Sequence, residues 1–320
     1  GEWPLDDYVS ERVAPHLPEL HPSWPETVRE RIAYAAPDDD LNYAILGMLL
    51  LEEHGRDLTT ADVRDAWLRH LPIETTFGPE RRALLRAGMN TLAGGSPDEV
   101  ETWAALLNPD DEKCGALIRA DAYGYACPGR PALAAELAWR DARLTHRRTG
   151  IYGAMFIAAA IASALVATGT STADRLGVFE TALQFVPRRS RFYQIASDSL
   201  GKAASARDWL DGYERIHGRY REYAHCCVFQ EVGTLMATLR FARDVGHGIC
   251  LQVSQGNDTD SFGATAGSLL GAFFGPGHLE RRWLAPFHDE IRTGLAFFYE
   301  RSLSSLARRM GRLPAIIRRD

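Results

Sequence analysis

The sequence predicts an all-α protein. No sustained alternation of β-branched and polar residues, which would indicate a strand, occurs along the chain. Instead, acidic or hydroxyl residues repeatedly precede apolar residues at helical spacing, as they do at helix starts. With 320 residues, of which 46% are hydrophobic, the chain can bury a sizeable core. No repeat, low-complexity tract or linker divides it, so we expect one domain over residues 1–320.

The N-terminal part of the chain contains an irregular stretch and then a clear helix start. Residues 1–26 are rich in proline, which breaks any long helix, so we expect a surface arm with short turns. Over residues 36–55, three consecutive aspartates, 38–40, precede an apolar run that Gly55 ends. This pattern predicts a helix with acidic groups at its N-terminus.

The middle of the chain predicts a succession of helices. Residues 94–111 are rich in Pro, Gly and Asp and are expected to form a loop with a helical turn or two. Helices are expected over 59–71, 79–89, 131–144, 151–169, 172–185, 190–208, 209–221 and 228–245.

The helix over 151–169 is unusual because it has no formally charged residue. Its length is near that needed to cross a bilayer, so a membrane span is one alternative. Much of it is Ala, Gly, Ser and Thr, however, and it stands alone. We therefore favour a helix buried on all sides and expect no membrane association.

The last predicted helix follows a second acidic motif. Asp258, Asp260 and Ser261 open it, and a side-chain oxygen there can cap the first turn. Glycines then recur at every fourth position, at Gly263, Gly267, Gly271 and Gly275. In a soluble helix each glycine costs roughly 1 kcal/mol relative to Ala. We expect that close approach of another backbone along this face offsets the cost.

Charge and cysteine content exclude several classes of function. The net charge is −6 and the pI about 6.0, so we expect no nucleic-acid partner. The five cysteines are odd in number and have no CxxC spacing. That argues against a disulfide framework and fits a reducing compartment. No signal peptide is visible after Gly1, and we expect a cytoplasmic protein. The oligomeric state is left open.

The two acidic motifs, 38–40 and 258–261, suggest that the N-termini of two helices meet. Carboxylates gathered in one place repel one another unless a cation neutralises them. All-oxygen donors favour Mg²⁺, with Mn²⁺ or Ca²⁺ as alternatives, and this many could hold two ions about 3.5 to 4 Å apart. The simpler alternative is that each motif is an exposed acidic loop before an ordinary core helix.

These motifs resemble those of a known family. GNDTDS, residues 256–261, is similar to the C-terminal GDTD(T/S) motif of the ADP-ribosylglycohydrolases, the dinitrogenase reductase-activating glycohydrolase family. PDDDLNY, residues 37–43, falls where that family has (T/S)DD(T). The segments 115–125 and 139–150 also resemble its substrate-side segments, and the resemblance runs from Trp3 to Arg292. It implies a single compact multi-helix domain, a binuclear Mg²⁺ centre and hydrolysis of a glycosidic bond at C1 of an ADP-ribosyl group.

The resemblance also implies roles for individual residues. Asp39 and Asp258 are the expected catalytic acids, which would position a water against a sugar with oxocarbenium character. The implied metal ligands are Asp38, Asp39, Asp40, Asp258, Asp260 and Ser261. The implied substrate contacts are Cys114, Gly115, Ala116, Leu117, Arg119, His146, Tyr152, Asn257 and Phe262.

Several of these substrate residues have an equally simple structural reading. Arg119 could belong to a buried ion pair with Asp121 and not to phosphate recognition. His146 could be a satisfied histidine at a helix end, and Phe262 and Tyr152 could be core aromatics. Each alternative stays open at this point.

The sequence departs from the family pattern in ways that bear on function. The glycine-rich N-terminal segment of the family is absent, so we expect the general-base Glu to lie upstream of Gly1. Asp38 stands where many family members have Thr or Ser, and Leu41 stands where many have Thr. Asn257 stands where Gly is common. These departures suggest a divergent branch, one that acts on a small ADP-ribosyl or other ribosyl metabolite.

Three functions therefore compete. The first is a Mg²⁺-dependent glycohydrolase that acts on an ADP-ribosylated or ribosylated substrate. The second is a non-catalytic homologue that keeps the metal site and binds ADP-ribose or a nucleotide. In the third, ions bound by the aspartates only stabilise the fold.

Overall fold

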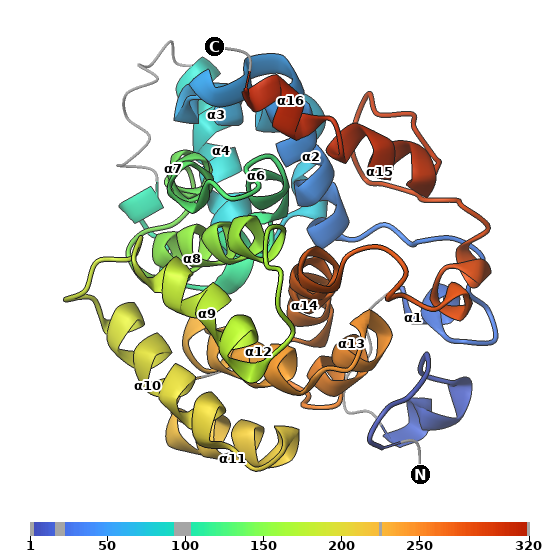
Figure 1. Cartoon of the computed structure of the whole chain (residues 1–320). Coiled ribbons are helices and arrows are strands. Elements are labelled where there is room, and N and C mark those ends of the chain that lie inside the picture. The colour runs from blue at the N-terminus through green and yellow to red at the C-terminus, as the bar shows by residue number, and fades with distance from the viewer. Residues whose placement is uncertain (1–2, 17–22, 93–103, 224–225, 319–320) are drawn as a thin grey trace.

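The computed structural model describes residues 3–16, 23–92, 104–223 and 226–318. Within these ranges the chain forms helices and isolated bridges but no strand, which confirms the predicted all-α class. The helices pack into one body in which the two ends of the chain meet, since α16 lies against α2 (Figure 1).

Most predicted helices are present, with small shifts at their ends. The helices are α1 (Trp24–Thr27), α2 (Asp39–His54), α3 (Thr60–His70), α4 (Gly78–Leu92), α6 (Asp121–Tyr125), α7 (Pro131–Ala142), α8 (Thr149–Ala164), α9 (Thr172–Leu183), α10 (Arg191–Ser205), α11 (Trp209–Arg219), α12 (Val228–Phe241), α13 (Val245–Val253), α14 (Thr259–Phe274), α15 (Leu303–Met310) and α16 (Leu313–Ile317). A 3₁₀ turn, η5 (Cys114–Ala116), precedes α6.

The uncharged helix α8 lies at the centre of the fold. It packs against α6, α7, α9, α10, α12 and α14, and nearly all of its residues are buried. Phe156 stacks on Phe179 of α9 and meets Phe192 of α10 edge to face. Neighbouring helices therefore account for its apolar surface, as predicted. Among the described residues, no helix is both long and apolar enough to cross a bilayer.

The N-terminal stretch is irregular where the structure describes it, apart from a 3₁₀ turn over Glu11–His16 and the short α1. Side chains of this stretch contact the C-terminal half of the chain. The Trp3 indole donates to the backbone oxygen of Ser254 over 2.9 Å, and the Tyr8 hydroxyl donates to that of Trp283 over 2.6 Å. Part of the predicted loop over 94–111, residues 94–103, lies outside the described residues.

The prediction of one helix over 228–245 is wrong. α12 ends at Phe241, and a separate helix, α13, begins at Val245. Asp244 is the N-cap of α13, where its side chain accepts from His247 N over 2.8 Å. Such a cap starts a new helix because it satisfies a backbone N–H that has no partner within the helix.

The expectation that another backbone closely approaches the glycines at every fourth position of α14 is also wrong. A Cβ at Gly263 or Gly267 would meet side chains of α13, at 3.1 Å and 3.4 Å, not another backbone. A Cβ at Gly271 or Gly275 would meet no described atom within 4 Å. Gly275 has a φ of 74° and ends the helix, so its conformation and not its packing requires glycine.

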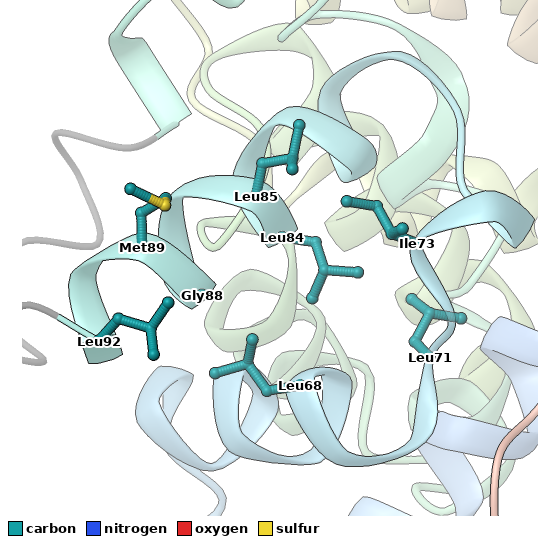
Figure 2. Close-up of a pocket in the computed structure, with 8 residues that line it drawn as sticks. All are labelled: Leu68, Leu71, Ile73, Leu84, Leu85, Gly88, Met89 and Leu92. Carbon is teal, nitrogen blue, oxygen red and sulfur yellow. The ribbon is translucent and has the colours of Figure 1, made fainter.

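An apolar depression of about 340 Å³ lies between α3 and α4 (Figure 2). It is lined by Leu68, Leu71, Ile73, Leu84, Leu85, Gly88, Met89 and Leu92. None of these side chains can donate or titrate, and the Met89 thioether is only a weak acceptor. The groups that could carry chemistry lie instead where α2, α6 and α14 meet.

Candidate functional site

The start of α2 gathers three carboxylates. Asp38 is the N-cap, and its side chain accepts from Asp40 N over 3.1 Å. One oxygen from each of Asp38, Asp39 and Asp40 lies within 4.8 Å of the others. Asp40 is buried, and neither of its carboxylate oxygens has a hydrogen-bond partner among the described residues. A buried carboxylate without a partner is costly unless a cation neutralises it, so this cluster suits a hard metal ion.

The start of α14 brings the second acidic motif beside the first. α14 packs against α2 as well as α6 and α8. Asp258 is the N-cap residue, Asp260 lies in the first turn, and Ser261 is buried. Both helix N-termini also favour negative charge, or an anionic ligand, at this place.

The electrostatics of the carboxylates show that the two motifs adjoin. Burial raises the pKa of Asp39 to about 8, and the charges of Asp38, Glu80 and Asp260 add to this shift. Burial also raises the pKa of Asp40 well above its usual value, and charges that include Asp260 and Asp258 raise it further. Because like charges gathered away from water disfavour ionisation, a bound cation would reverse these shifts.

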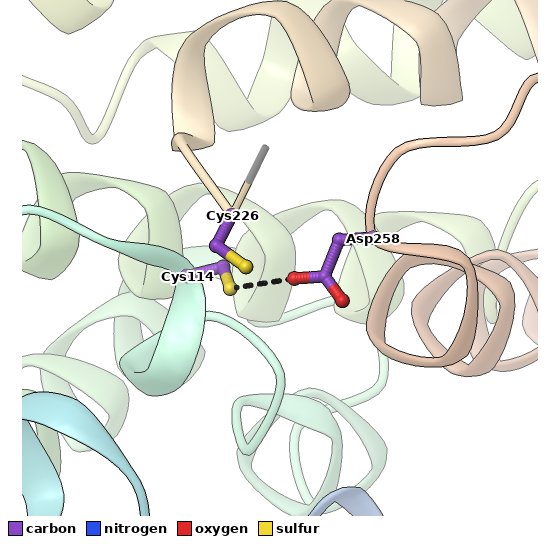
Figure 3. Close-up of side chains that lie close together, drawn as sticks. All are labelled: Cys114, Cys226 and Asp258. Atoms are coloured by element: carbon purple, nitrogen blue, oxygen red, sulfur yellow. Dashed lines mark hydrogen bonds between the residues drawn. The ribbon is translucent and has the colours of Figure 1, made fainter. Parts of the chain in front are cut away.

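Two thiols join the second motif (Figure 3). Cys114 in η5 donates from Sγ to Asp258 Oδ2 over 3.2 Å. Cys226 lies just before α12, and its Sγ, the Cys114 Sγ and an Asp258 oxygen all lie within 4.8 Å of one another. The two loops are also joined through their backbones, because Cys114 N donates to Cys226 O over 3.0 Å. Three segments distant in sequence therefore converge on one small cluster.

Glu231 on α12 completes this side of the site. It is 1% exposed, and its Oε1 accepts from Cys226 N over 3.1 Å. Its Oε2 is buried without a hydrogen-bond partner among the described residues. Burial raises the pKa of Glu231 to about 10, and the neighbouring Asp258 and Cys226 add to the shift. A carboxyl group with such a pKa is protonated at neutral pH unless a cation binds near it.

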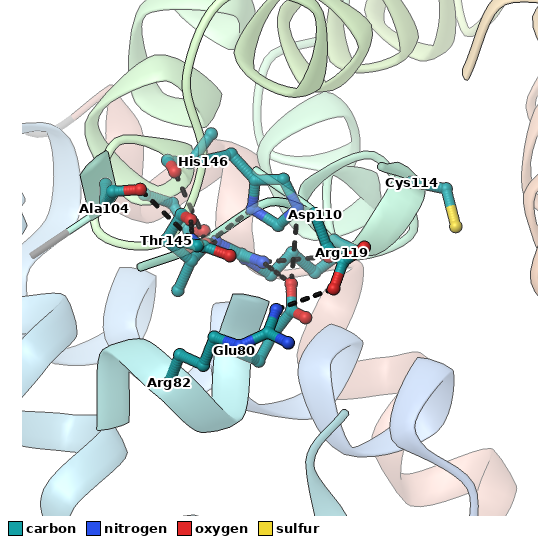
Figure 4. A network of polar contacts seen from close by, with 12 residues as sticks. Glu80, Arg82, Ala104, Asp110, Cys114, Arg119, Thr145 and His146 are labelled. Atoms are coloured by element: carbon teal, nitrogen blue, oxygen red, sulfur yellow. Dashed lines mark hydrogen bonds and ion pairs between the residues drawn. The ribbon is translucent and has the colours of Figure 1, made fainter. Parts of the chain in front are cut away.

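A buried ion-pair network lies on the other side of the site (Figure 4). The Arg119 guanidinium is 2% exposed and donates to Asp141, to Thr145 Oγ1 over 2.7 Å and to Glu80 Oε1 over 3.2 Å. The guanidinium carbon, Cζ, lies over the Trp67 ring, 4.8 Å from the ring centroid. Burial raises the pKa of Glu80 to about 7, although Arg119 opposes the shift.

Comparison with known proteins agrees with this arrangement. The sequence model of the family described as ADP-ribosylglycohydrolase matches residues 4–314. The chain belongs to the ADP-ribosylglycohydrolase family. A solved structure titled "ADP-ribosylglycohydrolase-related protein complex" is 22% identical in sequence, with a TM-score of 0.60 over 87% of this chain and 81% of that one. At this identity the likeness concerns the fold alone. No curated protein matches the sequence.

The ADP-ribosylglycohydrolase fold explains why the site lies where it does. Both acidic motifs begin helices with many buried residues, so the carboxylates are held by packed elements and not by free loops. Glu80 and Glu231 belong to the same neighbourhood, but the sequence analysis did not single them out. Glu80 stands in an ordinary amphipathic helix start. Glu231 is the one formally charged residue in the stretch Val228–Leu239, which is a signal that could have been used.

The substrate residues that the family resemblance implies divide into those buried in the core and those outside it. Ala116, Leu117 and Phe262 are at most 1% exposed and belong to the hydrophobic core, so their side chains face other core residues. Tyr152 is partly buried and packs against the same core. Asn257 has a φ of 66°, and its Oδ1 lies 3.1 Å from His217 Nε2. Of this set, Asn257 adjoins Asp258 without belonging to the core.

Arg119 and His146 also turn inward. Arg119 pairs with Asp141 and Glu80, not with Asp121, as the sequence alternative had it. Arg119 therefore belongs to a buried ion pair, as the structural alternative had it, but its partners are Asp141 and Glu80. His146 is fully buried, with Nδ1 2.7 Å from Thr145 Oγ1 and Nε2 3.6 Å from Glu80 Oε1. Burial lowers the pKa of His146 well below 6.5, and the Arg119 charge lowers it further, so the ring is neutral.

Proposed function

We propose that the protein is a Mg²⁺-dependent glycohydrolase that cleaves the C1 glycosidic bond of an ADP-ribosyl or related ribosyl compound. The observation that carries the proposal is the juxtaposition of the two acidic helix starts. Asp40, in the first turn of α2, is buried without a hydrogen-bond partner among the described residues, and the charges of Asp258 and Asp260 act on it. Family membership supplies the reaction class, and this cluster supplies the chemistry that the reaction needs.

The residues proposed to hold two Mg²⁺ ions are the oxygen donors of both motifs. They are Asp38, Asp39, Asp40, Asp258, Asp260 and Ser261. Mn²⁺ or Ca²⁺ could take the same donors, since all three ions prefer oxygen ligands. Bound ions would supply positive charge that polarises water and orients the hydroxyl groups of the ribose.

The chain's own carboxylates would then direct the attacking water. Asp39 and Asp258 are both partly exposed, so each can meet a substrate from solvent. The proposed role is to orient a water toward C1 and to accept its proton as the bond to the leaving group breaks. The sugar carries oxocarbenium character at that point, and the surrounding negative charge stabilises it. The proton passes finally to the leaving group.

The experiment is a release assay on a panel of ADP-ribosylated peptides, O-acyl ADP-ribose and simpler ribosides. We expect free ADP-ribose or ribose to appear with Mg²⁺ and not with a chelator. Asp39→Asn and Asp258→Asn should each lower kcat at least about 100-fold, in the range typical of positioned acid and base groups. Asp65→Asn, at an exposed acid on α3, is the matched control and should leave kcat unchanged.

Failure of turnover across the whole panel would contradict the proposal. Saturable binding of ADP-ribose in calorimetry, without release of product from any substrate, would instead identify a non-catalytic homologue that keeps the metal site. Mg²⁺ binding that raises the melting temperature, with no ligand able to raise it further, would leave only the structural role.

A further inference from the structure

The Cys114, Cys226 and Asp258 cluster differs in chemistry from the rest of the site. The two motifs offer hard oxygen donors, whereas this cluster offers two sulfur atoms and one carboxylate, all within 4.8 Å. Hard ions such as Mg²⁺ prefer oxygen, and thiolates select softer ions such as Zn²⁺. A zinc ion binds sulfur at about 2.3 Å with tetrahedral geometry, and three ligand atoms at this spacing can surround one ion.

The cluster is held in place by its surroundings. Cys114 N donates to Cys226 O over 3.0 Å, and the residues beside them, Lys113 and Cys227, form an antiparallel bridge. The η5 turn and the segment before α12 are therefore held together directly beside the two thiols. Cys226 has a φ of 63°, a left-handed conformation that a residue with a side chain rarely adopts. This backbone conformation accompanies a side chain that faces Cys114 and Asp258 (Figure 3).

A second, independent observation points to a cation at this place. Glu231 is 1% exposed and contacts Cys226 through its Oε1, yet its Oε2 is buried with no hydrogen-bond partner among the described residues. This buried oxygen belongs to a carboxyl group that neighbours Cys226 and Asp258, and leaving it unsatisfied costs free energy that a bound ion would recover. Glu231 is thus either a fourth ligand or the group that fixes the ligand loop.

We propose that Cys114, Cys226 and Asp258, supported by Glu231, form a binding site for one thiophilic divalent cation. The ion expected there is Zn²⁺. Binding replaces the two thiol protons with the metal, so two protons are released and no oxidant or reductant takes part. The ion shares Asp258 with the hard-metal site.

Sharing Asp258 gives the site a consequence for activity. Zn²⁺ on the sulfur side would draw on the negative charge of Asp258 and so weaken this carboxylate as a ligand and as a base on the other side. Zn²⁺ should therefore inhibit the glycohydrolase at concentrations set by this site. This part of the inference rests on the proposed function, whereas binding of the ion does not.

The direct test uses Co²⁺ as a spectroscopic probe of the purified, reduced full chain. Co²⁺ bound to thiolates absorbs in the near ultraviolet through charge transfer, and Zn²⁺ added afterwards should displace it and remove the absorption. We expect the absorption to be lost in Cys114→Ser and in Cys226→Ser. Cys227→Ser, at the neighbouring and partly exposed cysteine, is the matched control and should retain it. Glu231→Gln should weaken Zn²⁺ binding roughly 10- to 100-fold, as changes next to metal ligands do.

The outcomes separate this inference from the proposed function. No charge-transfer absorption in the wild-type chain, or absorption that persists in both variants, would overturn the metal site whatever the enzyme assay shows. Circular dichroism of each variant shows whether it has folded, and the two variants remove different ligands, so one that unfolds leaves the other to decide. If the absorption depends on both cysteines but no riboside is cleaved, the proposed function fails and the metal site stands. If turnover is present, wild-type activity should fall with Zn²⁺ while Cys226→Ser resists it.

Discussion

Gly115 lies against Glu80 so closely that a Cβ on Gly115 would stand 2.6 Å from the Glu80 Cδ. The contact joins η5 to α4, and Glu80 cannot retreat easily because it is 3% exposed and paired with Arg119. Glycine at this position is therefore required by close packing, whether or not it also contacts a substrate.

Gly115→Ala should destabilise the protein. The added methyl would force Glu80 from its ion pair, and overpacking of this kind costs about 1 to 3 kcal/mol. The measurement is the free energy of unfolding in urea. Gly201→Ala is the matched control, because Gly201 is exposed in α10 and its Cβ would meet no described atom within 4 Å. There alanine should stabilise by up to about 1 kcal/mol. Equal effects at the two positions would contradict the packing argument.

Arg119→Met should be among the most damaging single changes in the chain. It leaves Asp141 and Glu80 buried without their counter-charge, and breaking a buried pair in this way costs about 3 to 5 kcal/mol. Urea unfolding measures the loss. Arg207→Met removes an exposed ion pair with Asp211 and should leave the free energy of unfolding nearly unchanged, because solvent screens such pairs. If Arg119→Met left stability intact but weakened substrate binding, a phosphate-recognition role would replace the structural one.

The sequence predicted the helices that carry the site because their signals are local. Each acidic motif stands directly before an apolar run, and a helix N-terminus accepts such residues readily. The cap at Asp244 was equally local, yet the apolar residues on both sides of it masked the break. Apolar residues continue on both sides of the boundary between α12 and α13, which is marked only by the N-cap Asp244.

The rest of the site could not be predicted, because it depends on contacts between distant segments. Glu80 looks like any acidic residue in a first helical turn, and only Arg119 and Gly115, more than thirty residues away, make it part of a buried network. The sequence analysis assigned no role to Cys226, since nothing in its neighbours indicates that it meets Cys114. Spacing along the chain carries no information about such pairs.

Asp121 makes stability depend on pH. It is buried at the start of α6, where Ser268 Oγ donates to its Oδ2 over 2.7 Å. Burial raises the pKa of Asp121 to about 7, and the Ser268 hydrogen bond opposes the shift. The folded-state pKa lies above the unfolded value, so the protonated group suits the fold. Its contribution is fully present below about pH 4 and is lost as pH rises to about 7, at up to roughly 1.4 kcal/mol per pH unit.

Asp121→Asn should remove this dependence, because asparagine does not titrate and its oxygen can still accept from Ser268. We expect the variant to gain stability relative to the wild type as pH rises between about 4 and 7. Urea unfolding at a series of pH values gives the two curves. Asp174→Asn is the contrasting control: hydrogen bonds from Ser171 lower the pKa of Asp174, so this variant should lose stability relative to the wild type only as pH rises to about 4 and show no further change between about 4 and 7. Parallel curves for Asp121→Asn and the wild type would contradict the prediction.

Asp40→Asn separates two effects of the acidic cluster, its destabilisation of the metal-free fold and its binding of Mg²⁺. Without divalent metal, the variant should be at least as stable as the wild type. The change removes a buried acid whose charged form is disfavoured by burial and by Asp38 and Asp39, and whose oxygens have no hydrogen-bond partner among the described residues. With Mg²⁺ at about 100 times its Kd, the wild type should gain about 2.7 kcal/mol, whereas the variant should gain much less.

Thermal unfolding of both proteins with chelator and then with Mg²⁺ measures the two effects. Asp65→Asn, at an exposed acid outside the site, should respond to Mg²⁺ as the wild type does. If Asp40→Asn gained as much from Mg²⁺ as the wild type, the ion would bind elsewhere. The unpaired oxygens of Asp40 would then destabilise the folded state, and no bound ion would offset that loss of stability. Loss of stability in the variant without metal would show instead that Asp40 is protonated and packed, since a neutral acid and an amide differ in hydrogen bonding but not in charge.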